Sequence, residues 1–378
     1  MVAVQPGRAT AIARPLAEVD AQGYRITIAP GLIERAGELM RNSVPSHRFA
    51  VITDSNVAPL YAAQLVSQLE ESGHPVPLCT IPAGERHKTR ATWSLVTDDL
   101  LAAGLGRDTT LIALGGGVVC DLAGFVAATF MRGVPVVHIP TSLLAMIDAS
   151  IGGKTGVDTP AGKNLVGAFH QPVAVMIDPA VLVTLPLEEL RSGLAEAIKH
   201  GAIADAGYFE FLSRESAALL AASPGRRDVP ALNDVIEKSV RIKSGFVTAD
   251  EREKGARKAL NFGHTVGHAI ETLSGYSMRH GEAVGVGMLI ESRAAELEGI
   301  AEPGTAERIR EALEGAGLPT ARPAGPSASR VLESMMGDKK SRAGRIEYAV
   351  PSRIGAMAAE DSGYTVRLPD AVVAECLA

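Results

Sequence analysis

The chain has 378 residues, of which 46% are hydrophobic and 21% are charged, so it can bury a large core and form two domains. Its formal net charge of −6 offers no basic surface for nucleic acid or for an acidic membrane. Cys79, Cys120 and Cys376 are too few and too scattered for a disulfide framework or a cysteine-rich zinc module. Neither a signal peptide nor a membrane-spanning run is evident. We therefore expect a soluble, cytoplasmic protein that binds neither nucleic acid nor membrane.

The first half of the chain alternates short strand-like runs with helical patterns. The predicted strands are residues 24–28, 48–53, 76–81, 109–114 and 134–139, and the predicted helices are residues 57–71, 88–103 and a segment that begins at Val118. This alternation predicts a mainly parallel, Rossmann-like sheet with helices on both faces. Four of the strands end in the polar or glycine-rich segments DSN, AGERHK, GGG and PTS. Because ligands bind at the carboxyl ends of parallel strands, these are candidate binding loops on one edge.

From about residue 185 the pattern changes to long helices. The predicted helices are residues 187–200, 231–248, 261–273, 282–297 and 305–314, and residues 345–350 form a late strand-like run. We place a domain boundary near Pro186, with residues 1–185 as an α/β domain and residues 186–378 as a mostly helical domain. The cleft between the domains is the expected active site.

The glycine triplet 115–117 links a predicted strand to a predicted helix. Backbone N–H groups at such a junction can approach a pyrophosphate, and the helix dipole favours the anion. The run is not the G-x-G-x-x-G fingerprint, and a tight turn with close helix packing would also explain it. Asp54 and Asn56 could hold ribose hydroxyls, although both are also ordinary turn residues. The four loops together favour a bound nucleotide.

Residues 132–172 are rich in glycine and carry isolated charges: Arg132, Asp148, Lys154, Asp158 and Lys163. The same stretch is rich in Leu, Ile, Val and Phe, which indicates that it is packed rather than solvated. Since packed lysines need partners, we favour anion binding over a solvated loop.

Three histidines occur close together in the second half. His264 and His268 are four residues apart in a helical pattern, which places both imidazoles on one face, and His280 follows. Converging imidazoles with a carboxylate can bind a divalent metal, although hydrogen-bonded core histidines would show the same spacing. Glu196 is a candidate further ligand. It also forms a helical pair with Lys199, and such pairs usually lie on the surface.

Taken as a set, these motifs resemble the 3-dehydroquinate synthases of the sugar phosphate cyclase family. The resemblance covers about residues 54–288 and rests on GGGVVCDLAG, PTSLLAMIDASIGGKTGVDTPAGKNLVGAFHQP, TLPLEELRSGLAEAIKHG, DEREKGARKALNFGHTVGHAIE and RHGEAVGVGM, with DKK near residue 339. It implies a dehydroquinate synthase-like α/β domain that binds NAD, a mainly α-helical metal-binding domain, and a homodimer. Two positions depart from the family pattern. Ser142 stands where threonine is commoner, and Cys120 stands where glycine is usual and could make NAD binding sensitive to oxidation.

The resemblance implies roles for individual residues. Zinc, or cobalt as a substitute, would be bound by Glu196, His264 and His280, with His268 beside the substrate instead of in the metal site. The implied catalytic residues are Lys154, Lys243, Arg257, Asn261 and His268. The implied substrate-binding residues are these five together with Arg132, which reaches across the homodimer, Asn164, and one of Lys339 or Lys340, with Lys340 preferred.

The NAD contacts that the resemblance implies come from all the candidate loops. They are Asp54, Asn56, Gly84, Glu85, Lys88, Gly116, Gly117, Val118, Asp121, Thr141, Ser142, Asp148, Lys154, Lys163, Val181, Leu182 and Thr184.

The implied reaction converts 3-deoxy-D-arabino-heptulosonate 7-phosphate to 3-dehydroquinate and phosphate, a step of the shikimate pathway to aromatic amino acids. NAD would oxidise one hydroxyl transiently, phosphate would leave, the ketone would be reduced again, and an intramolecular aldol step would close the carbocycle. The alternatives are a sister cyclase such as amino-dehydroquinate synthase, a metal-dependent glycerol or alcohol dehydrogenase, and a non-catalytic nucleotide sensor. The dehydrogenases do not need the phosphate-binding lysines, and the intact metal set argues against a sensor.

Overall fold

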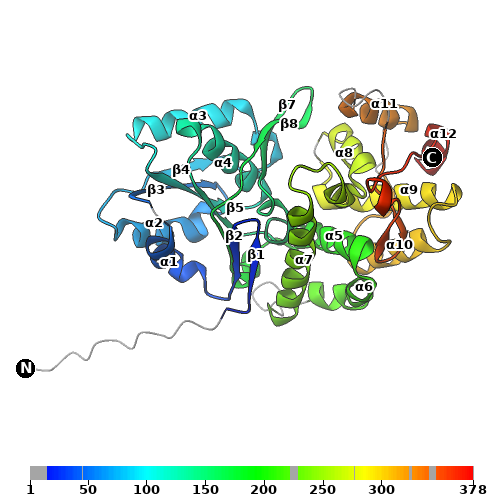
Figure 1. Cartoon of the computed structure of the whole chain (residues 1–378), viewed down its shortest axis with the longest axis horizontal. Coiled ribbons are helices and arrows are strands. Elements are labelled where there is room, and N and C mark those ends of the chain that lie inside the picture. The colour runs from blue at the N-terminus through cyan, green and yellow to red at the C-terminus, as the bar shows by residue number, and fades with distance from the viewer. Residues whose placement is uncertain are drawn as a thin grey trace, which may run out of the picture.

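The computed structural model describes residues 15–44, 46–221, 229–275, 277–322, 326–339 and 346–377. An α/β half is followed by a helical half, and a hairpin stands at the junction between them (Figure 1). The strands are β1 (Ala17–Ala21), β2 (Tyr24–Ile28), β3 (Arg48–Asp54), β4 (Leu78–Ile81), β5 (Thr109–Gly115), β6 (Val136–Pro140), β7 (Lys154–Thr159), β8 (Gly162–Phe169), β9 (Ala174–Ile177), β10 (Pro351–Arg353) and β11 (Ala356–Met357).

The α-helices are divided between the two halves. Those of the first half are α1 (Ala36–Ser43), α2 (Ala63–Glu70), α3 (Arg90–Ala102) and α4 (Gly117–Thr129). Those of the second half are α5 (Leu187–Ala204), α6 (Ala206–Ala221), α7 (Val229–Ala249), α8 (His264–Leu273), α9 (His280–Leu297), α10 (Thr305–Gly315), α11 (Ala328–Lys339) and α12 (Asp370–Leu377). Short helical turns that bear on the site are η3 (Glu85–His87), η6 (Pro179–Thr184) and η7 (Ala256–Asn261).

The predicted parallel sheet is confirmed. Seven strands lie in the order β1-β2-β9-β6-β5-β3-β4, and every neighbouring pair is parallel except β1 with β2. All seven residues of β5 are buried, as expected for a central strand covered on both faces. Ile112 and Leu114 belong to one buried cluster with α2, while Leu111 and Ala113 belong to another with α3 and α4.

Some sequence-based predictions need correction. Strands β1 and β9 and the β7–β8 hairpin were not predicted, because β1 and β9 are only five and four residues long and the hairpin is rich in glycine and polar residues. Asn261 ends η7, so α8 begins three residues later than predicted. The predicted strand at residues 345–350 is wrong in the part that is described, where Tyr348 forms only an isolated bridge to Val366. Helices α6, α11 and α12 were also missed.

The boundary predicted near Pro186 coincides with the residue that precedes α5. One buried cluster nevertheless extends from the sheet, through Val137 and Val175, to Leu194 and Ile198 of α5. The two halves therefore share hydrophobic core, which fixes the sheet edge relative to the helices.

Close helix packing in the second half depends on glycine. A Cβ atom on Gly281 of α9 would overlap the carbonyl oxygen of Ser192 in α5, and one on Gly287 would overlap the carbonyl oxygen of Gly263 before α8. Glu291 of α9 accepts hydrogen bonds from the backbone N–H groups of Gly263 (2.8 Å) and Val266 (2.9 Å), which satisfies the first turn of α8. Helices α5, α8 and α9 are thus held in a fixed arrangement.

We predict that Gly281→Ala lowers the free energy of unfolding by about 2 kcal/mol, because the added methyl group meets backbone and not a movable side chain. The matched control is Gly245→Ala in α7, where a Cβ atom has open space around it. That change should be neutral or stabilise the protein by roughly 0.5–1 kcal/mol through helix propensity. Denaturant unfolding of both variants checks this, and equal stabilities would contradict it.

Candidate functional site

The carboxyl ends of the parallel strands bring the predicted binding loops together. Gly115 at the end of β5 is in register with Pro140 at the end of β6, and Thr141 donates its N–H to the Gly115 carbonyl (2.9 Å). Gly116 precedes α4, and no side chain accepts a hydrogen bond at this cap. Its N–H groups can therefore bind an anion, with the helix dipole adding to the attraction.

The other predicted nucleotide contacts differ in whether their side chains or only their backbone groups could reach a ligand. Asp54 accepts hydrogen bonds from the backbone N–H groups of Asn56 (2.8 Å) and Val57 (3.1 Å), which is a turn, while the Asn56 side chain is exposed. Val181 and Leu182 bury their side chains in the core, so only their backbone could meet a ligand.

Lys88 is the centre of a buried ion cluster beneath these loops. Its Nζ lies 3.0 Å from Glu85, 3.1 Å from Asp121 and 3.7 Å from Asp158, and the residue is 3% exposed. Burial lowers the pKa of Lys88, but the carboxylates outweigh this effect and raise it above its usual range. Glu85 also lies 2.7 Å from Lys163 of the hairpin. The cluster therefore joins the β4–α3 loop to α4 and to the β7–β8 hairpin.

The three predicted histidines converge. His264 begins α8, His268 lies one turn later, and His280 begins α9. The ring centroids are 5.1 Å apart for His264 and His268, 5.3 Å for His264 and His280, and 5.7 Å for His268 and His280. Burial lowers the pKa of His264 to about 3, so this imidazole is neutral at pH 7 and has a lone pair available for a metal.

Glu196 on α5 completes the cluster. Its Oε1 lies 3.5 Å from Nε2 of His264 and 3.3 Å from Nε2 of His280, and its side chain is fully buried. Neither carboxylate oxygen takes part in a well-formed hydrogen bond. Burial raises the pKa of Glu196, but Lys199, His264 and His280 outweigh this effect and hold it well below its usual range. A buried, ionised carboxylate that faces two imidazoles fits a divalent metal.

The interpretation of Glu196 and Lys199 as a surface pair is wrong. Lys199 is 1% exposed and contacts both Glu196 and, at 4.0 Å, Asp148. The local spacing did not reveal this, because Leu194, Ala195, Ala197 and Ile198 lie on one side of the helix and Glu196 and Lys199 lie on the other, as in a surface helix. In the structure both sides of this part of α5 are buried.

Within the described residues, two groups have donor atoms close enough to bind a metal. One is His264, His268 and His280, and the other is Asp148, Glu196 and His200. The second group has Lys243 and Lys199 against Asp148, and these cations disfavour a metal there. The contacts from Glu196 to His264 and His280 link the two groups into one site.

The predicted substrate residues are held by carboxylates and backbone carbonyls. Lys243 pairs with Asp148, while Lys154 and Asn261 both contact Glu253. These contacts place the ammonium groups of Lys154, on the hairpin, and of Lys243, on α7, beside the helical half that contains the three histidines.

Arg257 lies within the same cluster and is 1% exposed. It donates to the carbonyls of Gly152 (2.8 Å) and Glu251 (2.6 Å). Burial, Arg257 and Lys243 lower the pKa of Lys154 to about 7, although its side chain is 46% exposed and solvent weakens this effect. Basic groups that repel one another in this way form a site for an anion.

Of the remaining predicted substrate residues, two are exposed and one lies outside the residues that the structure describes. Arg132 is exposed and has a left-handed backbone (φ 70°), and Asn164 is exposed with φ 53°. Lys340 lies outside the described residues, and the side chain of Lys339 is not described.

Sequence reasoning missed Lys199 and two carboxylates, Glu253 and Glu271, as members of the site. Glu253 could not be found from a pattern, because it lies in a loop with a left-handed backbone (φ 56°). Glu271 lies one turn after His268 on α8, and this spacing was an available signal.

Cys120 is 1% exposed, and burial raises the pKa of its thiol above the usual range. A buried, protonated thiol reacts slowly with oxidants, which argues against oxidation control of nucleotide binding.

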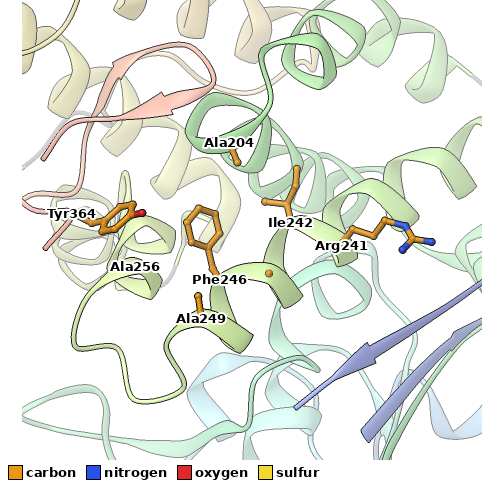
Figure 2. A pocket seen from close by; sticks show the side chains of 8 residues that line it. Ala204, Arg241, Ile242, Phe246, Ala249, Ala256 and Tyr364 are labelled. Carbon is orange, nitrogen blue, oxygen red and sulfur yellow. The ribbon is translucent and has the colours of Figure 1, made fainter. Parts of the chain in front are cut away.

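A cavity of about 310 Å³ is lined by Ala204, Arg241, Ile242, Gly245, Phe246, Ala249, Ala256 and Tyr364. Figure 2 shows the Phe246 and Tyr364 rings in this lining, with the guanidinium of Arg241 extending away from the apolar side chains. Its lining contains no carboxylate or imidazole for acid–base or metal chemistry. The charge cluster at the junction is therefore the candidate active site.

Family models and curated relatives match most of the chain. The family model described as 3-dehydroquinate synthase N-terminal matches residues 78–192, and the one described as 3-dehydroquinate synthase C-terminal matches residues 193–341. The chain is 45% identical over 335 residues to 3-dehydroquinate synthase of Desulforamulus reducens, covering 88% of this chain and 92% of the relative. It is 46% identical over 333 residues to that of Pelobacter propionicus, covering 88% and 91%.

Solved structures of similar fold include two synthases and a probable dehydrogenase. A 2-deoxy-scyllo-inosose synthase complexed with carbaglucose-6-phosphate, NAD+ and Co2+ has a TM-score of 0.85 at 22% identity, covering 96% of this chain and 99% of that chain. A 2-epi-5-epi-valiolone synthase from Streptomyces hygroscopicus with NAD+ and Zn2+ has a TM-score of 0.82 at 27% identity, covering 96% and 98%. A probable glycerol dehydrogenase from Sinorhizobium meliloti has a TM-score of 0.65 at 18% identity, covering 93% and 94%.

Proposed function

Since this chain belongs to the 3-dehydroquinate synthase family, we propose that the junction site converts 3-deoxy-D-arabino-heptulosonate 7-phosphate to 3-dehydroquinate and phosphate. The observation that carries the proposal is the close association of three features: a helix N-terminus open to an anion, a buried carboxylate facing imidazoles, and a cluster of basic side chains. A glycerol or alcohol dehydrogenase would need only the first two.

We assign NAD to the strand ends and a divalent ion, Zn2+ or Co2+, to Glu196, His264 and His280. When bound, NAD supplies a reversible oxidation of one substrate hydroxyl, and the ion acidifies that hydroxyl. The open cap at Gly116 supports a pyrophosphate position, and Oε1 of Glu196, which faces Nε2 of both His264 and His280, supports the metal position. His268 lies on the same face of α8 as His264. Because Glu196 contacts His264 and His280 and not His268, we assign His268 to the substrate.

The basic cluster would hold the two anionic ends of the substrate. Lys154, Lys243 and Arg257 have protein partners without substrate, namely Glu253, Asp148 and two backbone carbonyls. These partners keep the cations in position while no substrate is bound. A substrate carboxylate or phosphate that replaces part of these contacts gains charge-assisted hydrogen bonds with little reorganisation.

We further propose a homodimer in which Arg132 enters the neighbouring active site. Its side chain is exposed, and both Met131 and Arg132 have left-handed backbones, a costly conformation for residues other than glycine. The need to direct Arg132 toward a neighbouring subunit would explain this unfavourable backbone conformation.

No helix in the described part of the chain has both the length and the apolar character needed to cross a membrane. Cys79, Cys120 and Cys376 are free, which supports the cytoplasmic location that we propose. Recovery of the protein from an oxidising compartment after cell fractionation would contradict it.

We predict that Glu196→Ala and His264→Ala lose bound metal while remaining folded, because each removes a ligand from a three-residue set. His268→Ala should retain the metal and lose rate. Metal content after dialysis, measured beside circular dichroism, tests the assignment. Loss of metal from the His268 variant would show that the ligand set is wrong.

We predict that phosphate release continues through many turnovers on substoichiometric NAD, with no steady rise in NADH absorbance. The oxidation is reversed before product leaves, so the cofactor is regenerated in each cycle. Lys154→Met should lower kcat/KM by roughly 100-fold or more. The matched control is Lys258→Met, because Lys258 pairs with Glu347 (3.4 Å) outside the cluster and should retain activity. NADH accumulating in proportion to glycerol or another alcohol, without phosphate release, would overturn the proposal.

For the shared site, we predict that mixing Arg132→Ala protein with inactive Glu196→Ala protein restores part of the activity as subunits exchange. One of the two sites in a mixed dimer would then have both its metal ligands and an arginine from its partner. Exchange is followed independently with fluorescently labelled subunits. Proven exchange without any recovered activity would exclude the sharing of Arg132.

A further inference from the structure

Glu271 of α8 is a buried carboxylate to which the proposed reaction assigns no role. It is 3% exposed, and its two oxygens contact different elements. Oε1 accepts a hydrogen bond from Nζ of Lys163 on β8 (2.8 Å), and Oε2 lies 3.3 Å from Nδ1 of His280 at the start of α9. One side chain thus joins the hairpin of the first half to a histidine of the second half.

The contact to His280 determines how that imidazole is presented. With Nδ1 directed at Glu271, the other ring nitrogen, Nε2, faces Oε1 of Glu196 at 3.3 Å. A carboxylate that accepts from one nitrogen of a ligating histidine fixes the tautomer and the ring orientation and increases the basicity of the other nitrogen. The contact from Glu271 to Nδ1 therefore leaves Nε2 of His280 as the nitrogen that faces Glu196.

The contact to Lys163 determines how firmly Glu271 is held. The Lys163 side chain is 7% exposed and lies between Glu271 and Glu85, 2.7 Å from the latter. Glu85 is in turn 3.0 Å from the buried Lys88 beneath the strand-end loops. A chain of charged contacts thus runs Lys88–Glu85–Lys163–Glu271–His280–Glu196.

We propose that Glu271 is a positioning residue that orients His280 toward the metal and is itself held by Lys163 of the hairpin. The inference rests on the proposed function, because it takes His280 to be a metal ligand. It adds that metal affinity depends on a residue of the α/β half. The hairpin lysine then serves the metal site through Glu271, in addition to any contact with a nucleotide.

The test measures the affinity of the metal-depleted protein for Zn2+ by competition with a chromogenic chelator, without NAD or substrate. Glu271→Ala should weaken Zn2+ binding roughly 10- to 100-fold, the range observed when a carboxylate behind a ligating histidine is removed. Glu271→Gln should weaken it less, because the amide oxygen can still accept from Nδ1. The matched control is Glu282→Gln. Glu282 lies in the same turn of α9 as His280, but it accepts a hydrogen bond from the backbone N–H of Arg279 (2.9 Å). The affinity of the Glu282→Gln variant for Zn2+ should therefore stay within about twofold of that of the unmodified protein.

A double-mutant cycle tests the part played by Lys163. Lys163→Met should weaken Zn2+ binding in the presence of Glu271 and have little further effect in the Glu271→Ala background. Equal effects in both backgrounds would overturn the proposed link, as would unchanged Zn2+ affinity in a folded Glu271→Ala protein.

A separate variant distinguishes failure of this inference from failure of the metal assignment. If His280→Ala retains full Zn2+ affinity, His280 is not a ligand and the assignment on which the inference rests is wrong. If His280→Ala loses the metal and Glu271→Ala does not, only the role of Glu271 is wrong. Thermal unfolding of each variant shows whether a change in affinity reflects lost fold instead.

Discussion

The arrangement of the site depends on the burial of one carboxylate. Glu196 is fully buried on α5, and an ionised carboxylate in that environment is unfavourable unless positive charge or a metal lies beside it. Lys199 of the same helix supplies positive charge, and the imidazoles of His264 and His280 face the carboxylate from two other helices, where a metal would supply the rest. Removing one partner would leave the charge uncompensated, so the three helices must meet at this point.

Backbone packing allows them to meet. Gly281 lies against Ser192, and Gly287 lies against Gly263, at positions where any side chain would overlap a carbonyl group. Glu291 satisfies the N–H groups at the start of α8 from within α9. The histidines are therefore placed by main-chain contacts between helices, which are stiffer than contacts between flexible side chains.

The two halves of the molecule are joined in two different ways. An apolar cluster continues from the sheet into α5, and this provides non-directional adhesion. The ion pairs of Lys163 with Glu271 and of Lys154 with Glu253 provide directional contacts across the same junction. Since most of these charges already have partners, the site is arranged before any ligand binds, and the gain on binding an anion comes from exchanging partners.

The sequence by itself determined the parallel sheet, the four strand-end loops and the three histidines, because these depend on local periodicity and on turn chemistry. Strand β5 and the histidines at 264 and 268 were recognisable from spacing alone. The motifs that carry the family resemblance also implied Glu196, whose own surroundings suggested a surface pair. Tertiary structure decided what depends on residues far apart in the chain: the burial of Lys199, the pairing of Lys154 with Glu253, and the position of Glu271 between Lys163 and His280. Local propensity says nothing about such contacts, since a charged side chain on a helix has the same sequence pattern whether it faces water or a partner from another domain. The free energy of burying a charge is set by that partner, so only the folded chain determines which charged residues belong to the site.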